Sequence, residues 1–198
     1  MRHVERYDPL DLGNIKEGVV RALLEREAEP LPPIEAFVGI GIYTLYYLGS
    51  FPAYQPLAAA NTREVTVPIY VGKADTGTQG VYRRLCEHAR SISEAEGLDC
   101  GDFRCRFLVL HRVWITLAED ALVDYYRPLW NCLIKGFGIH TPGRGRGQQR
   151  RSMWDTLHPG RGFVAGLSLP AGDQTREDLG RQIREFLQRG QETNPGAG

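Results

Sequence analysis

The sequence lacks any long hydrophobic run. No stretch of it approaches the roughly 20 consecutive apolar residues that a membrane-spanning helix requires. The first residues, Met1 to Leu10, are charged and contain no apolar core of the kind found in signal peptides. These absences argue against a membrane protein and against secretion, so we expect the chain to act in the cytoplasm.

Cysteine is scarce and forms no CxxC pair. The four cysteines are Cys86, Cys100, Cys105 and Cys132. Reduced, mostly buried thiols are the default for a cytoplasmic protein of this size. The alternative is a zinc site built from Cys100, Cys105 and a histidine such as His111, but its spacing matches no common zinc module.

Length and composition limit the number of domains that the chain can form. The 198 residues are 42% hydrophobic, which is enough for a core, and they suit one compact domain with elaborations or at most two small ones. We expect a single domain over residues 1–190 and a disordered tail over 191–198. Within the domain we expect a catalytic core at about 37–135 and a basic, DNA-contacting segment at about 136–162.

The net charge of zero argues weakly against a nucleic-acid partner, but it hides an asymmetry. The stretch from Lys135 to Gly162 contains a single acidic residue, Asp155, and six cationic residues. These are Lys135, Arg144, Arg146, Arg150, Arg151 and Arg161. A local cationic patch of this kind suits contacts to phosphate.

Hydrophobic periodicity and turn residues predict the elements. We expect helices over 14–26 (capped by Asn14), 80–91, 117–126 and 175–189, strands over 37–48, 65–72 and 103–110, an inserted loop over 49–63, and an irregular glycine-rich stretch over 136–147. The first two strands form a plausible antiparallel pair. The order predicts an α+β fold with a small, mainly antiparallel, three-stranded sheet flanked by helices.

Six polar residues that could act on a phosphodiester follow one another along these elements. They are Tyr43, Tyr70, Arg84, His88, Glu119 and Asn131. The first strand contains Gly41-Ile42-Tyr43, and the second contains Ile69-Tyr70-Val71-Gly72 followed by Lys73. The next helix carries Arg84 and His88 at positions i and i+4, which share one face. A later helix carries Glu119, and Asn131 follows that helix.

In this ordered set the chain resembles the GIY-YIG nuclease superfamily. Val71 stands where the family name has isoleucine, a change that keeps the strand and leaves Tyr70 in place. The Arg84–His88 pair is similar to the pattern in GIY-YIG type II restriction enzymes. Further stretches look like the subgroup that cuts the palindrome CCGCGG, and the likeness runs from about Phe37 to about Arg161. These stretches are 136–140, 142–143, 152–155 and 158–161.

The resemblance implies a sequence-specific endonuclease that acts on double-stranded DNA as a two-fold homodimer. Two alternatives stay open. One is a repair or homing nuclease with the same core, although the chain shows no zinc-finger or helix-turn-helix signature. The other is a catalytically silent DNA-binding module, although Tyr43, Arg84 and Glu119 are all present.

Phosphodiester hydrolysis explains these residue types. Arg84 offers a permanently charged fork for phosphate oxygens. Glu119 offers a hard oxygen ligand for Mg²⁺, with Mn²⁺ as an alternative ion. Tyr43 as general base needs its pKa of about 10 lowered by Lys73, by the field of the metal, or by relay through His88, and His88 is itself the other candidate base.

The remaining predicted roles are supporting ones. Tyr70 is expected to hydrogen-bond the phosphate or to order the water, and Asn131 to position a phosphate or brace the site. Arginine reads guanine, and glutamine reads adenine or bridges through water, so the basic segment is predicted to contact DNA, unless it is a flexible linker. The predicted DNA-binding residues are Lys73, Arg144, Arg146, Gln148, Gln149, Arg150, Arg151, His158 and Arg161.

Each site residue also has a purely structural interpretation. The tyrosines could be ordinary strand aromatics, and Arg84 with Glu87 and His88 could form a solvated helix face. Thr116 and Glu119 have the spacing of a capping box, in which Glu119 would simply close the start of the helix. All these interpretations would have to hold together, which makes them jointly weaker than the nuclease hypothesis.

Overall fold

The structure is a computed structural model that describes residues 11–139, 150–165, 172 and 174–193. The remaining residues include 140–149, the middle of the predicted basic segment 136–162, and these ten residues therefore lie outside the described part. None of the helices in the described part has the length and apolar character that crossing a membrane demands.

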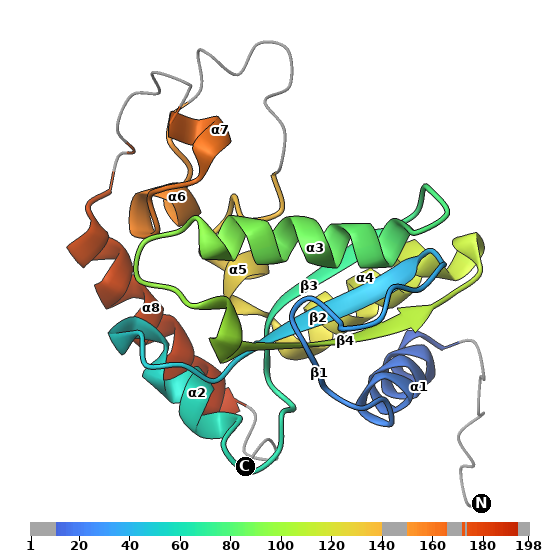
Figure 1. Cartoon of the computed structure of the whole chain (residues 1–198). Helices are drawn as coiled ribbons and strands as arrows, with labels where there is room; N and C mark the ends of the chain where they lie inside the picture. The colour runs from blue at the N-terminus through green and yellow to red at the C-terminus, as the bar shows by residue number, and fades with distance from the viewer. Residues whose placement is uncertain (1–10, 140–149, 166–171, 173, 194–198) are drawn as a thin grey trace, which may run out of the picture.

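A four-stranded antiparallel sheet forms the centre of the fold (Figure 1). Its strands are β1 (Glu29–Pro30), β2 (Gly41–Tyr47), β3 (Pro68–Ala74) and β4 (Phe103–Val109), in the order β1-β4-β2-β3. The predicted β2–β3 antiparallel pair is confirmed. The prediction of three strands was wrong, because β1 has only two residues, one of them proline, and so carries no alternation to recognise.

The central strand β2 separates two hydrophobic cores. Alternate side chains of a strand point to opposite faces, so Tyr43 and Leu45 join one core while Ile42 joins the other. The first core is covered by helices that include α3 (Gly80–Ser93) and α5 (Leu129–Cys132), and the second by α1 (Leu12–Leu24) and α4 (Arg112–Tyr126). In Figure 1, α3 crosses in front of the sheet and α4 lies behind it.

Smaller helices close one end of the first core. The inserted loop predicted over 49–63 contains a 3-10 turn, Pro52–Tyr54, and α2 (Gln55–Ala60), and a further 3-10 turn spans Cys100–Asp102. Helix α6 (Met153–Leu157) lies within the predicted basic segment, and α7 (Gly162–Ala165) and α8 (Arg176–Thr193) follow. Helix α8 continues into the stretch predicted to be a disordered tail, of which residues 194–198 lie outside the described residues.

Two helix starts differ from the sequence prediction. Asp11, not Asn14, caps α1, because its carboxylate accepts a hydrogen bond from the backbone N–H of Gly13 at 2.7 Å. Helix α4 begins at Arg112 after the cap residue His111, so Thr116 and Glu119 lie within the helix. The capping-box interpretation of Glu119 is therefore wrong, and its carboxylate is available for another role.

The cysteines of the described residues are free thiols. Cys105 Sγ donates to the carbonyl oxygen of Pro30 and Cys100 Sγ to that of Leu31, so both thiols help to fasten the segment that contains β1. Among the residues that the structure covers, no group of three His, Cys, Asp or Glu side chains could hold a metal ion. The alternative of a zinc site at Cys100 and Cys105 therefore finds no support.

A buried chain of hydrogen bonds joins four distant parts of the first core. Trp130 Nε1 donates to Tyr54 Oη at 3.0 Å, and Tyr54 Oη lies 2.6 Å from His158 Nε2. His158 Nδ1 lies 3.3 Å from the carbonyl oxygen of Glu96. Because a carbonyl only accepts, Nδ1 carries the proton and Nε2 accepts from the phenol. The network thus holds His158 in its neutral form.

This network makes stability depend on pH. Burial lowers the pKa of His158 from its usual 6.5 to about 3, so the unfolded chain binds the proton more tightly than the folded one. The contribution of neutral His158 is complete above pH 6.5 and is lost as the pH falls towards 3. At pH 5 the loss is about 2 kcal/mol of unfolding free energy. Urea titrations at pH 7 and pH 5 should show that His158→Gln removes this difference.

The exposed His111 supplies the control for this measurement, since its side chain makes no capping hydrogen bond. His111→Gln should keep the wild-type dependence on pH. An equal change of unfolding free energy between the two pH values in wild type and His158→Gln would contradict the assignment.

Candidate active site

Tyr43 and Gly72 face each other across β2 and β3, and the glycine makes room for the phenol. The two residues are cross-strand partners. A Cβ atom at Gly72 would lie 2.5 Å from Tyr43 Oη and 2.6 Å from Tyr43 Cζ, so no larger residue fits beneath the ring. Gly41 meets a similar limit, because its Cβ would lie 1.9 Å from the backbone oxygen of Leu108. Both glycines of the motif are thus required by close approach.

His88 of α3 packs against this phenol. Its Nε2 lies 2.7 Å from Tyr43 Oη, and the imidazole is completely buried. The ring stacks on Phe137 with centroids 4.5 Å apart and planes 18° apart, and it meets the edge of Tyr70 at 5.3 Å. The solvated-helix-face interpretation therefore fails for His88.

Burial and neighbouring charge act on the two phenols. Burial, and next the neighbouring Tyr70 phenol, raise the pKa of Tyr43 well above its usual value, while the positive charge of Arg84 lowers it. Burial raises the pKa of Tyr70 to about 12. The negative charge of Glu119 raises the pKa of both phenols. Tyr43, Tyr70, Arg84 and Glu119 therefore share one electrostatic environment.

The Arg84 guanidinium is held at this site from two sides. Its Nη1 donates to Glu87 Oε2 at 2.8 Å, and its Nη2 donates to the carbonyl oxygen of Gly138 at 3.2 Å. The Arg84 side chain is 26% exposed to solvent, which leaves it accessible to an anion. Arg84 and His88 both reach the site from one face of α3, as their spacing predicts.

Glu119 reaches the site from α4 and carries a bound lysine. Lys73 Nζ lies 2.7 Å from Glu119 Oε2, and the hydrogen bond to Glu119 raises the pKa of Lys73. The Glu119 side chain is 20% exposed. Lys73 thus pairs with the carboxylate, and the expectation that it would lower the pKa of Tyr43 finds no support.

Asn131 braces the edge of the sheet. Its Oδ1 accepts from the backbone N–H of Val71 at 2.9 Å, and its Nδ2 donates to the carbonyl oxygen of the same residue at 2.8 Å. Strand β3 lies at the end of the strand order, so these backbone groups have no neighbouring strand. Of the two roles predicted for Asn131, the contacts favour bracing.

Apart from Lys73, which pairs with Glu119, the predicted DNA-binding residues fall into three groups. Arg144, Arg146, Gln148 and Gln149 lie outside the described residues. Arg150 and Arg151 are exposed, as a phosphate contact requires.

His158 and Arg161 form the third group, and they are buried. His158 is completely buried and Arg161 is 1% exposed. Arg161 binds Asp155, the single acid of the basic stretch, with Nε 2.7 Å from Oδ1. Direct contact between these two residues and DNA finds no support, because the first core and an ion pair enclose them.

Two contributors were missed by the sequence reasoning as site residues. Glu87 binds Arg84 from one helical turn away, a spacing that could have indicated it. Residues 137–138 contact His88, Tyr70 and Arg84 from a distant part of the chain. The sequence singled out the stretch 136–140 only for its likeness to the CCGCGG-cutting subgroup, which did not indicate that contact.

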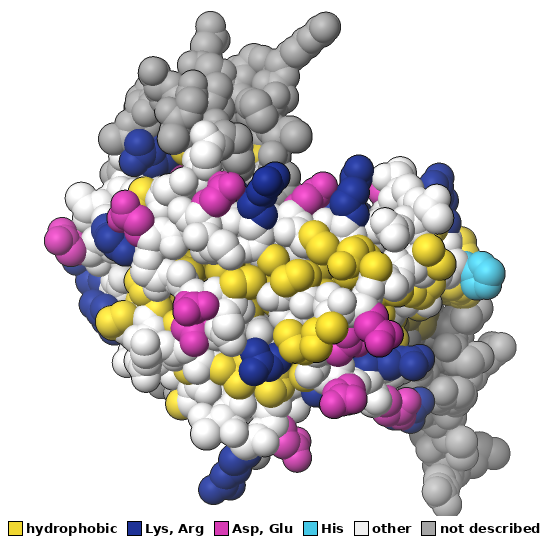
Figure 2. Space-filling view, viewed as in Figure 1, with side chains coloured by type: hydrophobic (Ala, Val, Ile, Leu, Met, Phe, Trp, Pro, Cys, Tyr) yellow, Lys and Arg dark blue, Asp and Glu magenta, His cyan; other side chains and the backbone are white. Residues whose placement is uncertain are grey.

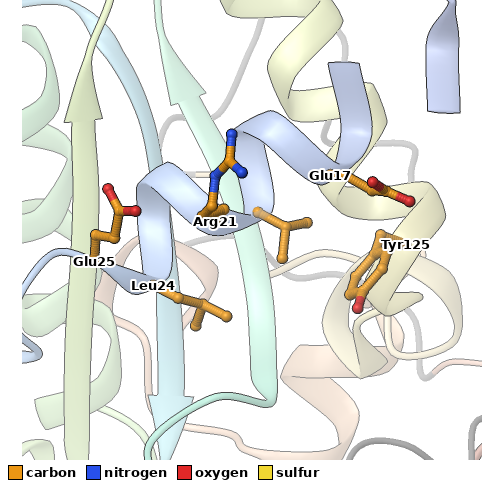
Figure 3. A pocket seen from close by; sticks show the side chains of 6 residues that line it. Glu17, Arg21, Leu24, Glu25 and Tyr125 are labelled. Atoms are coloured by element: carbon orange, nitrogen blue, oxygen red, sulfur yellow. The ribbon is translucent and has the colours of Figure 1, made fainter. Parts of the chain in front are cut away.

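Other surface features do not coincide with this site. Acidic and basic side chains are mixed on the face shown in Figure 2, and α3 carries the ion pair Arg83–Glu87. Neither positive nor negative charge therefore dominates this face. An open groove of about 440 Å³ lies between α1 and α4 (Figure 3). None of the predicted catalytic residues lines that groove, whose lining residues are Glu17, Val20, Arg21, Leu24, Glu25 and Tyr125.

The sequence profile described as "Eco29kI GIY-YIG domain" matches residues 35–187. The chain belongs to this family. The matched region contains the whole cluster around Tyr43, as well as α6 and most of α8. No curated protein matched the chain in a sequence search.

Membership makes this GIY-YIG protein a nuclease of the restriction-endonuclease type, with DNA as its partner. The sheet and flanking helices are compatible with that family. The resemblance inferred from Tyr43, Tyr70, Arg84, Glu119 and Asn131 is thereby confirmed at the level of the family.

Gly72→Ala should inactivate the enzyme while leaving it folded. The added Cβ must displace the Tyr43 phenol, and a misplacement of about 1 Å costs about 100-fold in rate. Overpacking should lower the unfolding free energy by about 1–3 kcal/mol. Cleavage rates and thermal unfolding measure the two effects.

Gly18→Ala in α1 is the matched control, because nothing lies within 4 Å of its Cβ position. It should raise stability by about 0.5–1 kcal/mol and leave cleavage unchanged. Full activity in Gly72→Ala would show that the position of Tyr43 does not matter.

Proposed function

We propose that this protein is a type II restriction endonuclease that hydrolyses both strands of double-stranded DNA at a GC-rich palindrome, as a Mg²⁺-dependent homodimer. The observation that carries the proposal is the convergence of Tyr43, Tyr70, Arg84 and His88, with the charge of Glu119 acting on both phenols. The family match supports the restriction-type nuclease.

Arg84 is the group proposed to bind the scissile phosphate. Glu87 and the Gly138 carbonyl orient its guanidinium, and part of the side chain stays exposed. A guanidinium fixed in this way stabilises the extra negative charge of the transition state without reorganising. Tyr70, at the same site and less buried than Tyr43, is proposed to hydrogen-bond the phosphate or the attacking water.

Tyr43 and His88 are proposed to share the task of general base. The raised pKa of Tyr43 argues against a standing phenolate. The 2.7 Å hydrogen bond supports a relay in which His88 Nε2 accepts the phenol proton while Tyr43 Oη accepts a proton from water. His88 lies behind Tyr43 and Phe137 and is fully buried, which favours the relay over direct contact between His88 and the water.

Glu119 is the residue proposed to hold the metal. Mg²⁺ binds through one or two carboxylates and keeps several waters, so a single, partly exposed carboxylate suits it. When bound, the ion would offset charge on the phosphate and on the departing 3′ oxygen. Lys73, with Nζ 2.7 Å from Oε2, holds the carboxylate in place.

Sequence recognition is proposed to lie in the basic segment. Arg150 and Arg151 are exposed within it. Together with Arg144, Arg146, Gln148 and Gln149 they supply guanine-reading forks and amides. The resemblance to enzymes that cut CCGCGG makes this palindrome the first one to test, and a two-fold dimer would place one active site on each strand.

The decisive experiment is digestion of plasmid DNA of known sequence with Mg²⁺, followed by mapping of the ends. A restriction enzyme gives discrete fragments with common ends. Random nicks would favour a repair-type nuclease, and binding without cutting would favour a silent DNA-binding module. Discrete cutting in EDTA would exclude the metal requirement.

Three substitutions should separate cutting from binding. Tyr43→Phe, Arg84→Ala and Glu119→Ala each remove a group that acts in the transition state, so the cleavage rate should fall by at least about 100-fold. DNA affinity measured without Mg²⁺ should change little. Glu64→Ala, at an exposed carboxylate, should cut like the wild type. Normal cleavage by Glu119→Ala would remove this residue from the site.

Light scattering tests the proposed dimer. A mass of twice the 22.2 kDa of one chain is expected at micromolar concentration. A single-chain mass, both free and with DNA, would rule out the symmetric arrangement.

A further inference from the structure

Arg161 uses every donor of its side chain to hold a short segment of the chain. Its Nε and Nη2 each lie 2.7 Å from a carboxylate oxygen of Asp155. Nη1 and Nη2 also donate to the backbone carbonyls of Gly136, Phe137 and Ile139 at 2.9–3.1 Å. A guanidinium has five N–H donors, so these five bonds occupy the complete set.

The pair is enclosed on all sides. Arg161 is 1% exposed and Asp155 is 4% exposed, and the guanidinium lies 4.5 Å above the ring of Trp154. Ser152 Oγ donates to the Asp155 carboxylate. Removing two charges from water costs free energy that their attraction often does not recover. Stability alone is therefore a weak reason for this pair, and the fixed geometry of residues 136–139 is a better one.

The segment that the pair holds touches three side chains of the active site. The carbonyl oxygen of Gly138 accepts from Arg84 Nη2 at 3.2 Å. The ring of Phe137 stacks on His88, and it meets Tyr70 at 5.0 Å with planes 82° apart. A Cβ atom at Gly138 would lie 2.6 Å from Tyr70 Oη, so the segment has little room to move towards the sheet.

We infer that Arg161 is a positioning residue for the nuclease reaction: together with Asp155 it clamps residues 136–139 and thereby sets the positions of Arg84 and His88. The inference rests on the proposed function, which gives these two side chains their roles. The basic residue assigned to DNA from the sequence thus acts from within the protein.

The test uses two variants and one control. Arg161→Lys keeps the charge but cannot supply the forked set of donors, and Asp155→Asn removes the ionic partner at nearly constant size. Arg106→Lys is the control. Arg106 also binds backbone, with Nε 2.7 Å from the carbonyl oxygen of Arg26, and it lies 5.1 Å from the Tyr46 ring, which is not part of the site.

Single-turnover cleavage at saturating enzyme is the first readout. Arg161→Lys and Asp155→Asn should lower the rate by about 10- to 100-fold, because Arg84 and His88 are misplaced. DNA affinity without Mg²⁺ and the folded circular dichroism spectrum should be retained. Arg106→Lys should cleave at the wild-type rate.

A double-mutant cycle separates positioning from a general structural defect. Lysine at position 84 cannot present the same fork to Gly138, so Arg161→Lys should cost clearly less in an Arg84→Lys background than in wild type. An equal fold-loss in both backgrounds would overturn the inference.

A second readout does not depend on cleavage. The Phe137 ring shifts the NMR resonances of the stacked His88 imidazole, which His88→Gln identifies among the five histidines. Arg161→Lys should move these resonances and Arg106→Lys should not. Unmoved resonances would overturn the positioning role even in an active enzyme, whereas a wild-type protein that cuts no DNA would overturn only the proposed function. If neither clamp variant folds, the pair serves folding, and positioning fails as a separate role.

Discussion

The two hydrogen bonds between the Asn131 amide and Val71 fix the open edge of the sheet, and the site depends on that edge. Strand β3 carries Tyr70 and Gly72 at alternate positions and Lys73 directly after them, and its other side is already paired with β2. A shift of one residue would exchange the faces of the strand and turn Tyr70 away from Tyr43. The Asn131 side chain thus satisfies the backbone groups that a further strand would otherwise bind, and the edge of the sheet stays open.

Much of the fold was readable because it rests on periodic patterns. Alternation and β-branched residues indicated β2, β3 and β4, and an apolar face indicated α1, α3 and α8. Two features escaped. Strand β1 is too short to alternate, and the start of α4 was placed late because Thr116 and Glu119 imitate a cap inside the helix. A local signal of that kind is overridden when the helix gains burial through Ile115.

The site shows a different division. The types and order of its residues were readable, since Tyr43, Arg84 and His88 meet as their spacing suggested. The partners of its charges were not. A count of cations between Lys135 and Gly162 treats Arg161 as exposed, although the one acid in that stretch lies against it. Charge composition reports how many ions a segment has, and only the folded chain decides which of them reach the solvent.

The described part of the chain contains two buried tyrosine–histidine hydrogen bonds, and the second can serve as a comparison for the first. Tyr54 and His158 meet at 2.6 Å under the positive charge of Arg176, while Tyr43 and His88 meet at 2.7 Å with both a guanidinium and a carboxylate nearby. The molecule therefore holds its own internal reference for proton sharing between phenol and imidazole. A difference between the spectra of the two pairs reports how their different charged surroundings change the phenol–imidazole hydrogen bond.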